Sequence, residues 1–117
     1  MSQRQREARA ERSTSESSAS IFAALGDPRR LRIVARLSSE GPLSITRLAS
    51  GSDVTRQAIT KHLAVLADAG LVRGARTGRE RLFELEPRPL GVAVRHLAAI
   101  SARWDAAIER LRSDVER

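Results

Sequence analysis

Residues 55–70, TRQAITKHLAVLADAG, are the segment that most restricts what this chain can fold into. The apolar side chains Ile59, Leu63 and Leu66 recur at spacings of four and three, which predicts an amphipathic helix with one buried stripe. The opposite face carries an arginine, a glutamine, a threonine and a lysine in its first two turns, with no acid before Asp68. Side chains of these types hold phosphates and donate to base edges, so the pattern indicates a DNA recognition helix.

Composition and charge restrict the class of protein. At 117 residues we expect one domain, with apolar runs too short for a membrane span or a signal peptide. The absence of cysteine excludes disulfides and thiolate metal sites and fits a cytoplasmic, nucleoid-associated protein. The net charge of +7 is localised: residues 29–81 hold eleven basic and four acidic side chains, whereas the segments before and after them are each balanced. This localisation favours a polyanion as partner.

The first part of the chain divides into a tail and two helices. Residues 1–17 are polar with no apolar stripe, which predicts an N-terminal tail without a packed role. Residues 18–25 are predicted to form a short first helix that ends at Gly26. Asp27 as N-cap and Pro28 at the first helical position predict a second helix to about residue 39. We expect this helix to bury Leu31, Val34 and Leu37 and to expose Arg29, Arg30, Arg32 and Arg36.

A third, short helix and the residue 55–69 helix complete a predicted helix-turn-helix. Ser44 is the expected N-cap of the third helix, and Thr55 is the expected N-cap of the next. The connection at residues 51–54 contains a glycine and is short, as in a helix-turn-helix. The alternative at this point is a helical hairpin within any small bundle.

A predicted two-stranded hairpin follows the recognition helix at once. Residues 71–76 are extended, 77–79 form a turn, and 80–86 alternate between apolar and polar side chains. We expect four arginines around the tip of this hairpin, at Arg73, Arg76, Arg79 and Arg81. An arginine-tipped hairpin beside a recognition helix is typical of a wing, here residues 73–81, that contacts phosphates or the minor groove.

The last predicted helix, residues 89–115, carries an apolar seam with steps of four and three. Its members are Leu90, Val94, Leu97, Ser101, Trp104, Ile108, Leu111 and Val115. A sustained repeat of this kind is typical of a coiled-coil-like contact, and the helix is longer than a domain of this size can cover. A second copy of the chain is therefore the expected partner. The alternative is a helix that folds back on its own domain.

The segments FAALGDPRRLRIVARL, LSITRLA, TRQAITKHLAVLADAGLV and RTGRERLFEL resemble, in this order, the ArsR/SmtB family of winged helix-turn-helix repressors. The resemblance covers the chain from about residue 21 onwards. It implies a mainly α fold with a small β-hairpin and a long C-terminal dimerisation helix, within a domain spanning residues 18–117. It also implies a homodimer joined through helices 18–25 and 89–115, with Ile21 and Phe22 in the interface besides the seam. The residues that match the family's DNA contacts are Thr55, Arg56, Gln57, Thr60, Lys61, His62, Arg76, Arg79 and Arg81.

The sequence departs from the metal-sensing members of that family. Where they carry a Cys-x-Cys type signature, the third helix here reads Leu43-Ser44-Ile45-Thr46. In the last helix, His96 and Asp105 are nine residues apart and fall on opposite faces, so we expect no metal and no other cofactor. His96 is expected at the surface or the interface. His62 lies toward the inward side of its helix, which favours packing over phosphate binding.

Together these patterns predict a dimeric, sequence-specific transcriptional regulator, and a repressor by resemblance, that binds an inverted repeat in double-stranded DNA. A winged-helix module that binds protein is the alternative. An enzyme is disfavoured, because the chain has no Ser/His/Asp set, no paired-carboxylate site and no glycine-rich phosphate loop. A small apolar ligand, a partner protein and simple autoregulation all remain open as the release signal.

Overall fold

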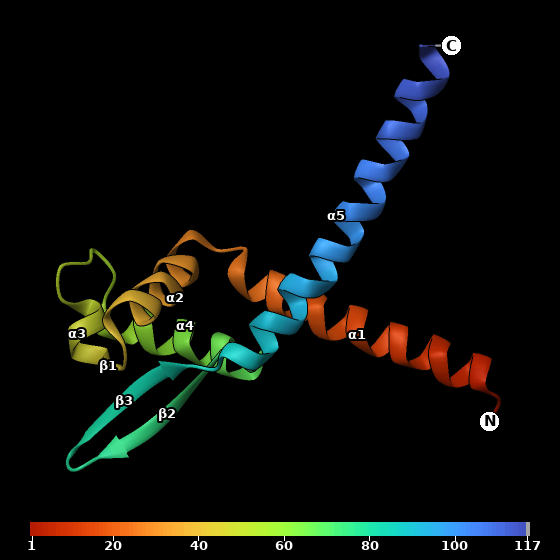
Figure 1. Ribbon diagram of the computed structural model, residues 1–117. Helices are drawn as coiled ribbons and strands as arrows, with labels where there is room; N and C mark the ends of the chain where they lie inside the picture. The colour runs from red at the N-terminus through yellow and green to blue at the C-terminus, as the bar shows by residue number, and fades with distance from the viewer. Residues whose placement is uncertain (117) are drawn as a thin grey trace.

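The computed structural model describes residues 1–116 and builds a small body from which two long helices extend (Figure 1). The elements, in chain order, are α1 (Gln3–Leu25), α2 (Pro28–Glu40), β1 (Leu43–Ser44), α3 (Ile45–Ala49), α4 (Arg56–Asp68), β2 (Val72–Thr77), β3 (Glu80–Leu85) and α5 (Pro87–Val115). The body contains α2, α3, α4 and the sheet, while α1 and α5 cross beside it and point away in different directions (Figure 1). The predicted fold class, mainly α with a small sheet and a long C-terminal helix, is confirmed.

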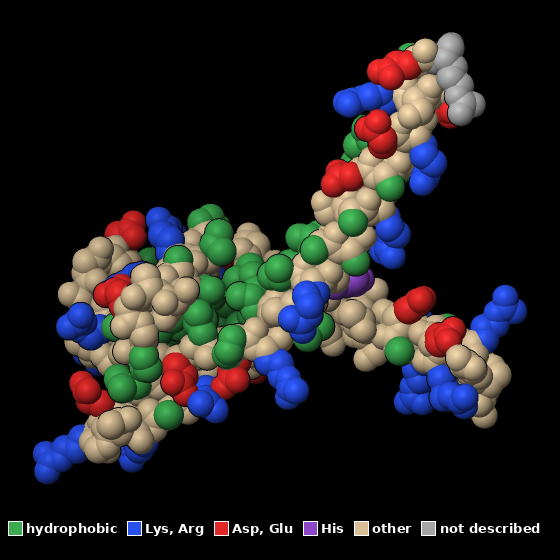
Figure 2. Space-filling model, viewed as in Figure 1, with side chains coloured by type: hydrophobic (Ala, Val, Ile, Leu, Met, Phe, Trp, Pro, Cys, Tyr) green, Lys and Arg blue, Asp and Glu red, His purple; other side chains and the backbone are tan. Residues whose placement is uncertain are grey.

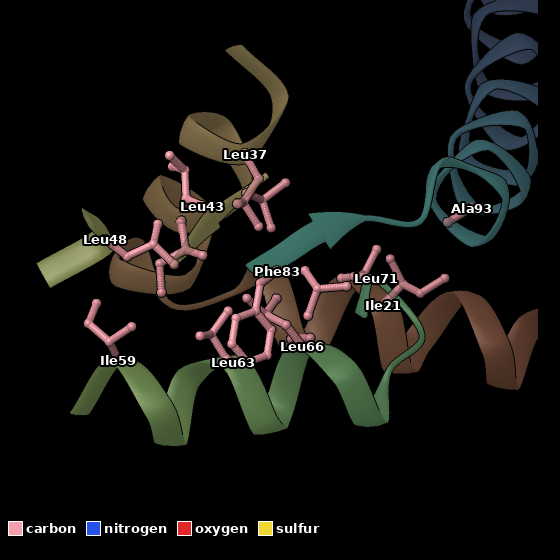
Figure 3. Close-up of a cluster of buried hydrophobic side chains, with 14 residues drawn as sticks. Ile21, Leu37, Leu43, Leu48, Ile59, Leu63, Leu66, Leu71, Phe83 and Ala93 are labelled. Atoms are coloured by element: carbon pink, nitrogen blue, oxygen red, sulfur yellow. The ribbon is translucent and has the colours of Figure 1, made fainter. Parts of the chain in front are cut away.

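One hydrophobic core holds the body together, and α4 lies along one side of it. The predicted stripe of Ile59, Leu63 and Leu66 is buried. Phe83 from β3 lies over the stretch of α4 between Leu63 and Leu66, and Leu71 lies beside them (Figure 3). Burial of such side chains is the main favourable term in folding. The orientation of α4 is therefore set by its apolar face.

Three predicted helix N-caps are confirmed by hydrogen bonds. Asp27 Oδ1 accepts from the backbone N–H of Arg29 at 2.8 Å, Ser44 Oγ from that of Arg47 at 3.1 Å, and Thr55 Oγ1 from that of Ala58 at 3.1 Å. Each bond satisfies a donor that the first turn of a helix leaves unpaired. The bond from the Arg29 N–H also holds the pKa of the Asp27 carboxyl below its usual value. Gly70, at φ 79°, ends α4 in the left-handed region.

The sheet has three antiparallel strands in the order β1-β3-β2, where the sequence predicted a two-stranded hairpin. In the hairpin, Arg76 lies opposite Arg81 and Gly78 (φ 64°) lies in the turn, which agrees with the turn predicted at residues 77–79. The additional strand is β1, whose Leu43 pairs with Phe83 and whose Ser44 pairs with Leu82. Ser44 also caps α3, so this short strand joins the wing to the helix-turn-helix.

Two predictions about the first helices are wrong. The first helix was expected at residues 18–25, but α1 begins at Gln3, so the polar segment before residue 18 is mostly helical, although nearly all of its side chains are exposed. A capping box starts this helix: Ser2 Oγ accepts from the Gln5 N–H at 3.2 Å, and Gln5 Oε1 accepts from the Ser2 N–H at 2.8 Å. In α2, Leu31 is 52% exposed and Ile33 takes the buried place beside Val34 and Leu37. Residues 33, 34 and 37 form the face of α2 that meets the core.

The crossing of α1 and α5 is packed through small side chains. Ala93 of α5 and Ser18 of α1 are buried there, and Ser18 Oγ lies 3.0 Å from His96 Nδ1. His96 is thus half-buried at this crossing within the protomer. Beyond it, nearly all of α5 is exposed up to residue 116. Within residues 1–116, no helix is both long and apolar enough to cross a membrane.

The burial of α4 leads to a first prediction. Leu66→Ala removes a side chain with no exposed surface and leaves a cavity, so the free energy of unfolding should fall by about 3 kcal/mol. The neighbouring Val65 is 41% exposed, and Val65→Ala should lower it by about 0.5 kcal/mol or less. Urea denaturation of both variants compares the two costs. Equal losses of unfolding free energy in the two variants would contradict the burial of Leu66 in the core.

Candidate nucleic-acid interface

The exposed face of α4 brings together the polar side chains that the sequence predicted. Arg56, Gln57, Thr60 and Lys61 are all exposed. No acidic side chain lies between them, because Asp68 is the only acid in the helix and ends it. Two of the predicted contacts have internal roles: the Thr55 hydroxyl caps the helix, and the Thr60 hydroxyl donates to the Arg56 carbonyl at 2.9 Å. The freest donors are therefore Arg56, Gln57 and Lys61.

His62 lies apart from this face. Its side chain is half-buried, and its charge contributes to lowering the pKa of Asp27, after the larger contribution of the bond from the Arg29 N–H. This places His62 on the side of α4 that faces the start of α2. The position agrees with the inward orientation expected from the helical wheel, and it separates His62 from the other predicted contacts.

The turn between α3 and α4 is supported by Arg36 of α2. Its Nη1 donates to the carbonyls of Arg47 and Leu48 at 3.2 and 3.1 Å, and its Nε donates to Glu40 at 2.8 Å. These bonds satisfy carbonyls at the end of α3, which a short helix leaves unpaired. The Arg36 guanidinium also holds the pKa of Glu40 below its usual value. Arg36, predicted as merely exposed, is half-buried and ties α2 to the helix-turn-helix.

Of the four arginines expected at the tip of the wing, three lie toward the tip. Arg79 is in the turn, and Arg76 and Arg81 face each other across the strands. The Arg81 guanidinium carbon lies 5.2 Å from the centre of the Phe83 ring, a cation–π contact. Gly74 leaves room for it, since a Cβ there would lie 2.7 Å from Arg81 Nε.

Arg73 is not at the tip, which corrects the expectation for it. Its Nε lies 2.7 Å from Glu84 and 2.8 Å from Glu86, at the base of the wing. The hydrogen bond that Arg73 Nε donates to Glu84 Oε1 is the main reason that the pKa of Arg73 is raised. Among residues 1–116, no ion pair involves Arg76, Arg79 or Arg81. The cationic part of the wing is therefore its distal half.

The residues predicted for a dimer interface fall into two groups. Ile21 is 3% exposed and Leu90 is packed against the core, so both serve the protomer itself. The second group is open to solvent along the outer part of α5, where Figure 2 shows a line of apolar side chains. Its exposed large members include Val94, Leu97, Trp104, Ile108 and Leu111, with Phe22 of α1 more weakly exposed.

Sequence reasoning missed Ile100, which is 43% exposed on the same helix. Its spacing of three from Leu97 and four from Trp104 was the signal that could have found it. No group of three His, Cys, Asp or Glu side chains that could hold a metal ion occurs in the part of the chain that the structure describes.

Comparison with known proteins places this geometry in a family. A family model described as a helix-turn-helix domain matches residues 25–75. The uncharacterized HTH-type transcriptional regulator YuzN of Bacillus subtilis is 45% identical over 76 residues, which are 60% of this chain and 83% of that protein. The HTH-type transcriptional regulator Rv2034 of Mycobacterium tuberculosis is 40% identical over 78 residues, 67% of this chain and 72% of its own length.

Solved structures agree with the sequence relatives. An ArsR-like transcriptional regulator from Rhodococcus sp. RHA1 superposes with a TM-score of 0.76 at 36% identity, over 86% of this chain and 94% of that one. The chain belongs to the ArsR family of winged helix-turn-helix transcriptional regulators, which are DNA-binding proteins and not enzymes.

Proposed function

We propose that this protein is a homodimeric repressor that binds an inverted-repeat operator through α4 and the distal wing. The observation that carries the proposal is the exposed face of α4. It holds Arg56, Gln57 and Lys61 without an acid, while its opposite face is fixed in the core. A helix held in this way presents its donors in one orientation, as readout of a major groove requires.

The exposed side chains divide by the contacts their chemistry suits. Gln57 carries an amide that pairs with adenine in the major groove, and Thr60 and Arg56 lie next to it on the helix. Lys61 and the wing arginines carry cations suited to phosphates, which supply affinity and salt dependence but no sequence preference. Arg76 and Arg79, at the distal end of the wing, suit the backbone or the narrow minor groove beside the site.

The apolar line along α5 supports a dimer. Trp104 is 69% exposed and Leu111 is 66% exposed, although large apolar side chains at heptad-like spacing are normally covered. A solved winged helix-turn-helix domain from Mycobacterium bovis is described as homodimeric and superposes with a TM-score of 0.62 at 20% identity, which relates the folds. In the proposed dimer, α5 of each protomer packs on the other, and two α4 helices face successive major grooves.

The release signal is proposed not to be a metal. At the start of α3 the side chains are Leu43, Ser44, Ile45 and Thr46, and the Ser44 hydroxyl is used as the helix cap. Such side chains make a poor ligand set for soft or borderline metals.

An electrophoretic mobility shift with the full chain tests the proposal. The probe is the palindrome upstream of the protein's own gene, and a scrambled duplex of equal length is the competitor. We expect binding to the palindrome to persist at a salt concentration that releases the scrambled duplex. No binding to either duplex at low salt would instead favour a winged-helix module that binds protein.

Gln57→Ala tests base readout. This change should cost roughly 1–3 kcal/mol on the preferred operator and relax the preference at one base position in each half-site. Binding to random duplex should stay unchanged, because phosphate contacts are retained. Selection of bound sequences from a random pool, with wild type and variant side by side, measures the preference. An unchanged preference would remove Gln57 from base recognition.

Arg79→Ala and Arg73→Ala form a matched pair for the wing. Arg79 has no ion-pair partner within residues 1–116, so its loss should weaken binding to all sequences and lower the salt slope by about one for each protomer, or about two for the dimer. Arg73 is held by Glu84 and Glu86, so Arg73→Ala should change the slope much less. Fluorescence anisotropy across a chloride series gives both slopes. The reverse order would place the DNA at the base of the wing.

Trp104→Glu tests the dimer. A carboxylate in the apolar seam should raise the dimer dissociation constant at least tenfold, because a charge there would be buried without a partner. Ala106→Glu adds the same group on the opposite face of α5, where side chains are exposed, and should leave association unchanged. Sedimentation velocity over a concentration series compares them. Equal behaviour of the two variants would exclude this face as the interface.

A further inference from the structure

A cavity of about 620 Å³ lies between α2 and the loop that joins α3 to α4. In Figure 1 this loop rises beside α2 at the left of the molecule. Three arginines of α2 line the cavity, Arg29, Arg32 and Arg36, which recur at spacings of three and four along one side of the helix. The opposite wall is the loop itself, residues 50–54. The volume of the cavity is within the usual range for small-molecule sites.

The cavity is lined by more positively charged side chains than negatively charged ones. Arg36 is already bonded to Glu40 and to the end of α3. The guanidinium groups of Arg29 and Arg32 take part in no ion pair with any side chain of residues 1–116. Among the described residues that line the cavity, Asp53 is the only acidic one. Two cations thus face a concave site with one carboxylate, which favours an anion there.

The rest of the lining suits an anionic group that is attached to an apolar portion or to a nucleic-acid backbone. Ile33, Leu48 and Ile59 come from the buried core and form apolar wall, while Ser50 and Ser52 add polar wall from the loop. The Ser52 hydroxyl already accepts from the Val54 N–H at 3.0 Å, which shapes the loop. Arginine forks bind phosphate oxygens with two parallel bonds, so a phosphate group matches this set.

We propose that this arginine-lined cavity is a phosphate-binding site, formed by Arg29 and Arg32 against the loop at residues 50–54. The loop leads directly into Thr55, the N-cap of α4. A phosphate held between α2 and this loop therefore acts next to the start of the exposed α4 helix. The same chemistry has two possible sources, the phosphodiester backbone of DNA and a free phosphorylated small molecule, and the experiment below separates them.

The first arm uses no DNA, so its result is independent of the proposed operator binding. The full chain, labelled with ¹⁵N, is titrated with inorganic phosphate against chloride at constant ionic strength. We expect saturable shifts of the backbone amides at residues 50–54 and at Arg29 and Arg32. In the double variant Arg29→Gln/Arg32→Gln the phosphate dissociation constant should rise at least tenfold. The control variant Arg9→Gln/Arg12→Gln removes two exposed arginines of α1 and should bind as wild type.

Shifts that do not saturate, or that are the same in the double variant, would overturn the site. Circular dichroism of the double variant checks that the fold is kept, which we expect because Arg29 and Arg32 are exposed.

The second arm identifies the source. A DNA duplex is titrated into wild type, double variant and control across a chloride series. If the phosphate belongs to DNA, the salt slope of the double variant falls by about two for each protomer, or about four for a bound dimer, and the duplex shifts the amides of residues 50–54. If it belongs to a free molecule, the slope is unchanged and inorganic phosphate still shifts these amides in the DNA complex. Either result supports the site. An unchanged salt slope in the double variant, together with no shift of the residue 50–54 amides of wild type by duplex or by inorganic phosphate, would contradict it.

Discussion

The packing of α4 against the core is the interaction on which the rest of the structure depends. Leu63 and Leu66 lie beneath Phe83 of β3 and next to Leu71, so one helix face is fixed by contacts from the sheet and from the chain that follows it. Close packing of this kind leaves little freedom to rotate. The opposite face of the same helix therefore keeps one orientation, and its arginine, glutamine and lysine are presented together. The face of α4 that packs in the core is thus opposite the face that we propose to recognise DNA.

Contacts around α4 also fix the position of the wing and of the turn that precedes α4. Ser44 serves two elements, since its backbone pairs with Leu82 of β3 while its hydroxyl caps α3. Arg36 bonds α2 to the end of α3. Together they link the wing, the first helix of the helix-turn-helix and α2. The charged surface proposed to meet DNA is carried by elements that are joined, which is what a preorganised binding surface requires.

Much of this arrangement was predictable because it depends on local chemistry. The caps at Asp27, Ser44 and Thr55 and the turn at Gly78 follow from side-chain and backbone preferences that act within a few residues. The features that were missed depend on distant partners. Strand β1 has two residues and exists because β3 lies beside it. Arg73 was expected at the tip of the wing, but its partners Glu84 and Glu86 come from the other side of the hairpin.

Helical periodicity was informative only where a helix has one apolar face. The polar start of α1 has no such face, so its pattern indicated a tail, although its capping box was present in the sequence. In α2, periodicity identified apolar positions but not which of them face the core, so Leu31 was expected inside. The family resemblance placed Ile21 of α1 in an interface, whereas it is buried within the protomer. Those assignments depend on how the helices are rotated against their neighbours, which one helix alone does not determine.

The central claim is that two copies of α4, held at a fixed separation, recognise DNA together. Hydroxyl-radical footprinting of the full chain on the region upstream of its own gene tests this most directly. We expect two protected patches related by two-fold symmetry, with centres about one helical turn, or a whole number of turns, apart. A single patch, or protection without a defined spacing, would contradict it.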